Sequence, residues 1–230
     1  QINNSIHIAV PGVYLDRRTS EESLGFARRA ARLDPMDARG QLCLGWALIL
    51  SGAFDQGGLH HQFAVELNEN DPWILISSAL GAAFRRDHAL AQTLSERAMS
   101  LSFEPGPAYW GYCAQIAFLR GEHALAAAHA AAAEGLTHFL GWRAAAAAWS
   151  GEEEEARDAW RRFLALARER WDGVGEPTAE AVAHWFLHSY PIRDQEDWAR
   201  LREGIARAGA PVGHCLWESC SVTPLLTRRS

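Results

Sequence analysis

The feature that most constrains the fold is a pattern of small and large apolar residues that repeats every 34 residues. An Ala-x-x-Leu pair recurs at this step, at Ala30/Leu33, Ala64/Leu67 and Ala98/Leu101. A second set keeps the same step, because Gly45 is followed by Ala79 and Leu48 by Ala82. A unit of this length holds two short helices that cannot bury their apolar faces alone, so neighbouring units must stack. The sequence therefore predicts an all-α array of helical hairpins.

Capping residues mark the ends of the predicted helices. Asp71 is an N-cap residue, and Pro72 follows it at the first helical position. Thr19 and Glu22 have the spacing of a capping box, which predicts the start of a helix that ends at Asp34. Helix breaks therefore fall where the period requires them.

The later units depart from the period. Gly121 and Gly151 are predicted hairpin turns, and their close spacing makes Glu134–Leu140 a shortened connection. Two further helices, Thr178–Ser189 and Asp194–Ala208, are expected to cap the last apolar face. The predicted organisation is a lead-in segment over 1–18, repeats over 19–170, capping helices over 171–211 and a loose tail over 212–230.

Composition and charge narrow the functional classes. The 230-residue chain is 48% hydrophobic and 22% charged, as in ordinary folded proteins, and its formal charge of -6 argues against a nucleic-acid partner. It contains no signal-peptide pattern and no apolar stretch long enough to span a membrane. The four cysteines are too scattered for a disulfide framework. We therefore expect a cytoplasmic protein with reduced thiols and no membrane contact.

The repeat resembles a known family. The A-x-x-L-D-P pattern that ends at Pro35, the G-x-F-D pattern that ends at Asp55 and the 34-residue step are similar to the tetratricopeptide repeat over Ser20–Phe163. This resemblance implies a right-handed superhelical solenoid of about five to six helical hairpins. Its first helices are then expected to line a concave groove.

The end of the chain resembles a narrower group. Tyr190–Asp194 and Leu201–Pro211 are similar to the close of the helical domain that follows class III adenylate or guanylate cyclase modules, or winged-helix modules, in bacterial signalling proteins. Ile192 stands where that group has Phe, and Gln195 stands where it has a second Pro. The catalytic or DNA-reading residues of those modules would lie outside this sequence, so none is assigned here.

The resemblance also implies a set of groove residues, at the second, fifth, ninth and twelfth places of each unit. The candidate partner-binding residues are Arg39, Leu42, Trp46, Ile49, Trp73, Ile76, Leu80, Gln115 and Phe118. Apart from the tryptophans, only Arg39 and Gln115 have hydrogen-bonding side chains, which rules out a carboxylate clamp and predicts an apolar, aromatic groove. Trp46 and Trp73 are candidate anchors for a helix or an extended peptide. The alternative is that they pack against the capping helices of the chain itself.

Histidines and cysteines were considered as ligands or catalysts. His184 and His188 have the spacing of two zinc ligands, but Trp185 stands where a zinc hydrolase has its Glu. His214 with Cys215 and Cys220 is a second candidate chelating group. Neither set has the remaining ligands of a recognised motif, so no metal, cofactor or catalytic residue is assigned. Glu152–Glu155 are expected in the first turn of a helix, opposite the positive end of its dipole.

Two functions from different classes remain open. The first is a non-enzymatic scaffold for protein or peptide partners, a regulatory or sensory segment of a bacterial signalling or transcription-control protein. The second is a receptor that binds a small apolar effector in the concave aromatic groove. An enzyme that uses His or Cys in the groove has no motif in its support. The oligomeric state is not predicted.

Overall fold

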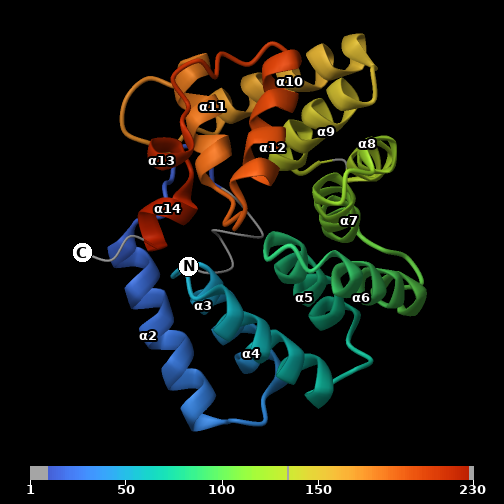
Figure 1. Cartoon of the computed structure of the whole chain (residues 1–230), viewed down its shortest axis with the longest axis vertical. Helices are drawn as coiled ribbons and strands as arrows, with labels where there is room; N and C mark the ends of the chain where they lie inside the picture. The colour runs from blue at the N-terminus through green and yellow to red at the C-terminus, as the bar shows by residue number, and fades with distance from the viewer. Residues whose placement is uncertain (1–9, 134, 228–230) are drawn as a thin grey trace.

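The computed structural model describes residues 10–133 and 135–227. Within these ranges the chain forms thirteen helices and no strand, which confirms the predicted all-α solenoid (Figure 1). None of the described helices combines the length and the apolar composition needed to cross a lipid bilayer.

Four antiparallel hairpins form the body of the molecule. They are α3 Ala38–Ile49 with α4 Phe54–Leu67, α5 Pro72–Phe84 with α6 His88–Leu101, α7 Pro107–Leu119 with α8 His123–Ala132, and α9 Thr137–Trp149 with α10 Glu153–Glu169. The connection expected over Glu134–Leu140 is shorter than predicted, because α9 already begins at Thr137; Glu134 itself lies outside the described residues. Successive first helices α3, α5, α7 and α9 contact one another, so the hairpins stack into a curved array.

Local sequence explains the hairpin boundaries. The Asp71 side chain accepts hydrogen bonds from the N–H groups of the first turn of α5, as predicted. Gly121 and Gly151 adopt positive φ at the turns of their hairpins, the conformation for which glycine is preferred. Arg86 takes the same left-handed conformation in the second hairpin, with a φ of 72°, although it is not glycine. Its side chain is used in a contact described below.

The first helices carry the core. Helix α5 is buried on all sides from Ile74 to Phe84, and α7 is buried from Gly111 to Leu119. A helix that is apolar all round must be enclosed by its neighbours. By contrast, α4 and α10 bury one face and leave the other in water. The layer of first helices is therefore the inside of the superhelix.

Helix α2, Arg17–Leu33, precedes the first hairpin and packs on α3. Leu24, Ala27 and Ala31 meet the α3 residues Leu44 and Leu48. The N-cap predicted at Thr19 is wrong by three residues, because Asp16 is the N-cap and its carboxylate accepts the N–H of Thr19. An aspartate at N-cap makes the same bond that a Thr capping box would make three residues later.

The capping helices form as predicted and close over the array. Helix α11, Ala179–His188, begins after the N-cap Thr178, and α12, Gln195–Arg207, begins after the N-cap Asp194. Helix α12 packs closely on α9, since a Cβ on Gly204 would lie 2.8 Å from the Cβ of Ala145. These helices cover the last apolar face of the repeats.

The prediction of a loose tail over residues 212–230 is wrong for its described part, residues 212–227. These residues form α13, Trp217–Cys220, and α14, Val222–Thr227, and both Cys220 and Val222 are buried. The hydroxyl of Thr223 donates a hydrogen bond of 2.7 Å to the carbonyl of Ile192. Short helices that pack on a capping layer need no repeat period, so the period gave no signal for them.

The two ends of the superhelix are brought together. A Cβ on Gly52, in the α3–α4 turn, would lie 2.8 Å from the side chain of Thr227 in α14. At the other side, the N–H of Asp172 donates to the carbonyl of Pro11 at 2.8 Å, which ties the lead-in segment to the loop after α10. Figure 1 shows α14 lying beside the start of the array, so the C-terminal segment links the first hairpin to the capping helices α11 and α12.

Candidate functional site

The predicted groove residues lie on the inner helices α3, α5 and α7, but most of them are not open to solvent. The buried members are Leu42, Trp46, Ile49, Ile76, Leu80, Gln115 and Phe118. Arg39 and Trp73 remain partly or largely accessible at the edge of the array. Of the nine predicted groove positions, a partner can therefore reach only Arg39 and Trp73 in this conformation. Binding at the other seven positions stays a prediction.

Trp46, one of the two proposed anchors, is part of the core. Only 1% of its surface is exposed, and its indole N–H donates to the Ser77 hydroxyl at 2.8 Å. Its ring makes edge contacts with His61 and Phe84 at centroid distances of 5.0 and 6.2 Å. These partners belong to α4 and α5, so Trp46 packs among the repeat helices, and none of the three belongs to the capping helices.

Trp73, the second proposed anchor, lies at the accessible edge. Its ring contacts Tyr109 and Tyr112 at centroid distances of 5.8 and 5.6 Å. Nearby, the Arg39 guanidinium pairs with Asp71 at 2.8 Å. This aromatic edge, with one exposed cation beside it, is the part of the predicted groove that a partner can contact directly.

The inside of the superhelix is occupied by a segment of the chain itself, Tyr190–Arg193, which connects α11 to α12. The Tyr190 ring is buried among Phe84, Trp142 and Phe186, at centroid distances of 6.4, 4.9 and 5.4 Å. Burial raises the pKa of its phenol. Ile192 is also buried. The segment therefore packs against the inner helices α5 and α9 and against the capping helix α11.

Backbone and charge fix this segment in place. The N–H of Arg193 donates to the carbonyl of Phe84, at the end of α5, over 3.0 Å. Its guanidinium makes two hydrogen bonds, of 2.6 and 3.3 Å, to the two carboxylate oxygens of Asp55. The same guanidinium lies 5.8 Å from the centre of the Phe54 ring. This non-helical segment is thus held by aromatic packing, one backbone hydrogen bond to α5 and one bidentate ion pair.

A second ionic contact ties α12 to the α5–α6 turn. The Arg86 guanidinium lies 2.8 Å from Asp194, 3.2 Å from Glu196 and 3.4 Å from Asp197. The carboxylate of Asp197 is buried and also pairs with Arg200 at 3.1 Å. Burial raises the pKa of Asp197, although both arginines oppose this shift. The left-handed backbone of Arg86 points its side chain into this cluster.

The histidine and cysteine candidates lie close together but are engaged with other groups. His188 has one ring nitrogen 3.1 Å from the carbonyl of Cys220 and the other 2.9 Å from that of Leu15. Burial lowers the pKa of His188, and the two carbonyls oppose this shift. The Nδ1 of His184 lies 3.2 Å from the hydroxyl of Tyr14. No group of three His, Cys, Asp or Glu side chains within the described ranges is arranged to bind one metal ion.

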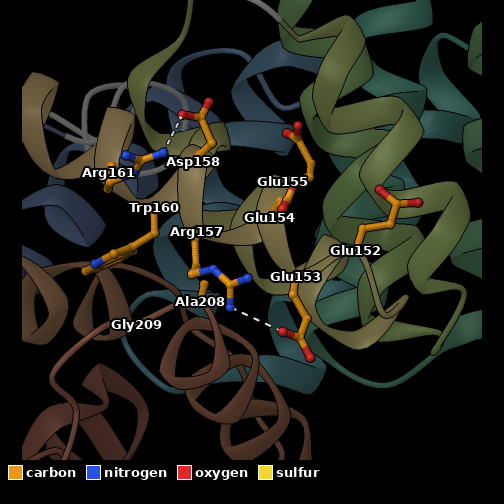
Figure 2. A pocket seen from close by; sticks show the side chains of 10 residues that line it. All are labelled: Glu152, Glu153, Glu154, Glu155, Arg157, Asp158, Trp160, Arg161, Ala208 and Gly209. Carbon is orange, nitrogen blue, oxygen red and sulfur yellow. Dashed lines mark hydrogen bonds and ion pairs between the residues drawn. The ribbon is translucent and has the colours of Figure 1, made fainter.

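The surface has an open acidic cleft beside the start of α10 (Figure 2). Its volume is about 1130 Å³, and its lining residues are Glu152, Glu153, Glu154, Glu155, Arg157, Asp158, Trp160, Arg161, Ala208 and Gly209. Figure 2 shows two of the carboxylates paired within α10, Glu153 with Arg157 and Asp158 with Arg161. Of the predicted Glu152–Glu155, the last three occupy the first turn of the helix, where the dipole favours negative charge, and Glu152 is the N-cap residue.

Three further pockets have volumes of about 610, 280 and 280 Å³. The pocket of about 610 Å³ lies at the α3–α4 turn beside Arg193. One of the two smaller pockets lies between the third and fourth hairpins, and the other lies between α6, α7 and α8. None of the nine predicted groove residues lines any of these four pockets.

Comparison with solved structures identifies the architecture. A chain in the crystal structure of the APC/C hetero-tetramer Cut9-Hcn1, a tetratricopeptide-repeat structure, superposes with a TM-score of 0.60 at 15% sequence identity. The fold is a tetratricopeptide-type solenoid. The match covers 92% of this chain and 40% of the other, so this chain spans well under half of the length of that solenoid. No family model and no curated protein matches the sequence.

The sequence missed the residues that decide how the inner face is used. Tyr190 and Ile192 belong to a segment that was noticed for its resemblance, but nothing in the repeat period places it inside the superhelix. The one available signal was composition, since Tyr-Pro-Ile is an apolar stretch between two helices where a solvent-exposed connection would be polar. Asp55 and Arg193 are 138 residues apart and carry no local pattern that pairs them.

Proposed function

We propose that this chain is a non-enzymatic scaffold for protein or peptide partners, within a regulatory or sensory part of a bacterial signalling or transcription-control protein. One observation carries the proposal: the inner helices α5 and α9 already hold a non-helical peptide segment, Tyr190–Arg193. The contacts are those used in peptide recognition, namely aromatic packing, a backbone hydrogen bond and a bidentate Arg–carboxylate pair. The bacterial and regulatory setting comes from the resemblance of the C-terminal segment alone.

The receptor alternative has less support. A small apolar effector needs a largely enclosed, mostly apolar cavity of about 300 to 1,000 Å³. The large cleft beside α10 is open and lined mainly by charged side chains, and the inner face is packed with aromatic rings. A ligand would have to displace Tyr190 to enter. A protein partner can instead use the accessible edge at Trp73 without any rearrangement.

Site-specific photo-crosslinking of the full chain tests the scaffold function. A benzophenone side chain replaces Trp73 at the accessible edge, and a matched variant carries it at Val174, a fully exposed loop position. Irradiation in lysate of the source organism should crosslink position 73 to one discrete polypeptide. Excess chain without the benzophenone should compete for that polypeptide and abolish the crosslinked product. Native mass spectrometry is run in parallel. A bound small molecule with no crosslinked polypeptide would favour the receptor. If no exposed position gives a crosslinked polypeptide and no small molecule is bound, the scaffold function is refuted.

A further inference from the structure

Helix α2 carries an apolar stripe that no described residue covers. Phe26, Ala30 and Leu33, called here the α2 stripe, are spaced four and three apart and so share one helix face. Phe26 is 72% exposed and Leu33 is 80% exposed, and Ala30 between them is exposed as well. Figure 1 shows α2 at the end of the array beside α3. Two large exposed apolar side chains on one face indicate an interaction surface.

The repeat period identifies which kind of element belongs on this face. One step of 34 residues takes Ala30 to Ala64 in α4, and a second step takes it to Ala98 in α6. Both of these alanines are completely buried, because α3 packs on α4 and α5 packs on α6. Helix α2 therefore has the register of a second helix of a hairpin, and Ala30, at the centre of the stripe, marks the face on which a first helix would lie.

The described part of the chain does not supply that first helix. One period before α3, residues 4–15 would have to form it, and residues 10–15 of this segment are not helical. Pro11 and Gly12, the latter with a φ of 85°, turn the chain away from α2. The carbonyls of Pro11 and Val13 then accept hydrogen bonds from Asp172 and Trp185, close to α10 and α11. Residues 10–15 thus pack against the C-terminal part of the array, and no described residue covers the α2 stripe.

Charge indicates the nature of the occupant. Helix α2 contains five arginines and two glutamates, a formal charge of +3 within a chain of -6. Pairing of α2 with α2 of a second copy would bring two such positive helices together, which is unfavourable. An acidic helix would instead be attracted, above all by Arg29, which lies next to the stripe on the helix surface.

We infer that the α2 stripe docks an acidic amphipathic helix of a partner protein, placed on α2 as α3 is placed on α4. This inference rests on the proposed scaffold function and adds a surface and a partner chemistry to it. Ala30 is small and lies between Phe26 and Leu33, which leaves room for one large apolar side chain of the partner. Glutamates beside that side chain would face Arg29.

The test uses two synthetic helical peptides with the same leucine and alanine stripe, one flanked by glutamates and the other by lysines. Fluorescence anisotropy measures their binding to the full chain at low and high salt. The acidic peptide should bind at least about tenfold more tightly than the basic one at low salt, and this preference should shrink as salt screens the charges. Phe26→Asp should weaken binding by at least about tenfold, because a buried aromatic contact is replaced by a charge.

Phe103→Asp is the matched control, because Phe103 is 97% exposed on the loop after α6, away from α2. It should leave peptide binding unchanged, and circular dichroism should show that both variants keep their helices. Equal affinity of the two peptides, or unchanged binding to Phe26→Asp, would overturn the inference. Sedimentation velocity that shows dimers abolished by Phe26→Asp would assign the surface to a second copy instead. Crosslinked partners that are insensitive to Phe26→Asp would leave the scaffold function standing and remove only this surface.

Discussion

His61 is the residue whose protonation should most affect stability. It is buried in α4 against the ring of Trp46, and burial lowers its pKa from 6.5 to about 3. The unfolded chain therefore binds a proton below about pH 6.5 that the folded chain does not bind until about pH 3. Stability must fall as pH falls through this window, by about 1.4 kcal/mol per pH unit for this one group.

Urea unfolding at pH 7 and pH 4.5 measures this effect. The wild type should lose about 2 to 3 kcal/mol more than His61→Leu between the two pH values, since the variant lacks the titrating ring. The pKa values of other histidines, including His188 and His123, are also lowered by burial, so both proteins should lose some stability in acid. An identical loss in the two proteins would show that His61 is accessible to protons in the folded chain.

Gly81 tests how tightly that ring is packed. A Cβ on Gly81 would lie 2.5 Å from the Cε1 and Nδ1 atoms of His61, closer than any relaxed contact. Gly→Ala within a helix ordinarily stabilises by up to about 1 kcal/mol, whereas overpacking a core costs about 1 to 3 kcal/mol. Gly81→Ala should therefore destabilise the chain in thermal or urea unfolding. One 34-residue step takes His61 to Ser95, so serine is the residue that the next unit uses at this position. Adding His61→Ser to Gly81→Ala should therefore restore most of the lost stability.

At the scale of elements, the segment between α11 and α12 allows the contribution of aromatic packing to stability to be measured separately from that of the ion pair. Tyr190 is enclosed by three aromatic rings, so Tyr190→Ala should lower the free energy of unfolding by about 3 to 5 kcal/mol. Asp55 is largely exposed, so Asp55→Asn should cost less than about 1 kcal/mol although it removes a bidentate ion pair. Chemical denaturation of both variants decides the point; equal losses would mean that the ion pair holds the segment.

Individual elements also show what the sequence can and cannot predict. The N-caps Asp71 and Asp194, the helix start near Thr178 and the turn at Gly151 were predicted because a cap or turn is specified by neighbouring residues. The packing of α13–α14 and of residues 190–193 was not found, because it depends on contacts between distant segments. The nine groove positions were placed on the inner helices, but the period carries no information about what covers them.

At the scale of the whole molecule, the C-terminal segment acts as a bridge that closes the superhelix. Thr223 in α14 donates to Ile192, Cys220 faces His188, and Thr227 lies against Gly52 in the first hairpin. The inner segment is thus held from two sides, by Phe84 of α5 and by α14. Because α14 supports the segment that packs on the inner helices, we expect the accessibility of the inner face to depend on α13–α14.

Removal of residues 212–230 tests that dependence by amide hydrogen exchange. Without α13 and α14, the N–H of Arg193 should exchange faster, because its bond to Phe84 is no longer supported by the Thr223–Ile192 contact. The interior of α5 should stay protected, since it is buried by its own neighbours. Leu216→Ser is the control, because Leu216 is exposed and its change leaves α13 and α14 in place. If Arg193 exchanges equally slowly in the truncated chain, the inner face is closed by aromatic packing around Tyr190 alone, and a partner peptide would have to displace that ring directly.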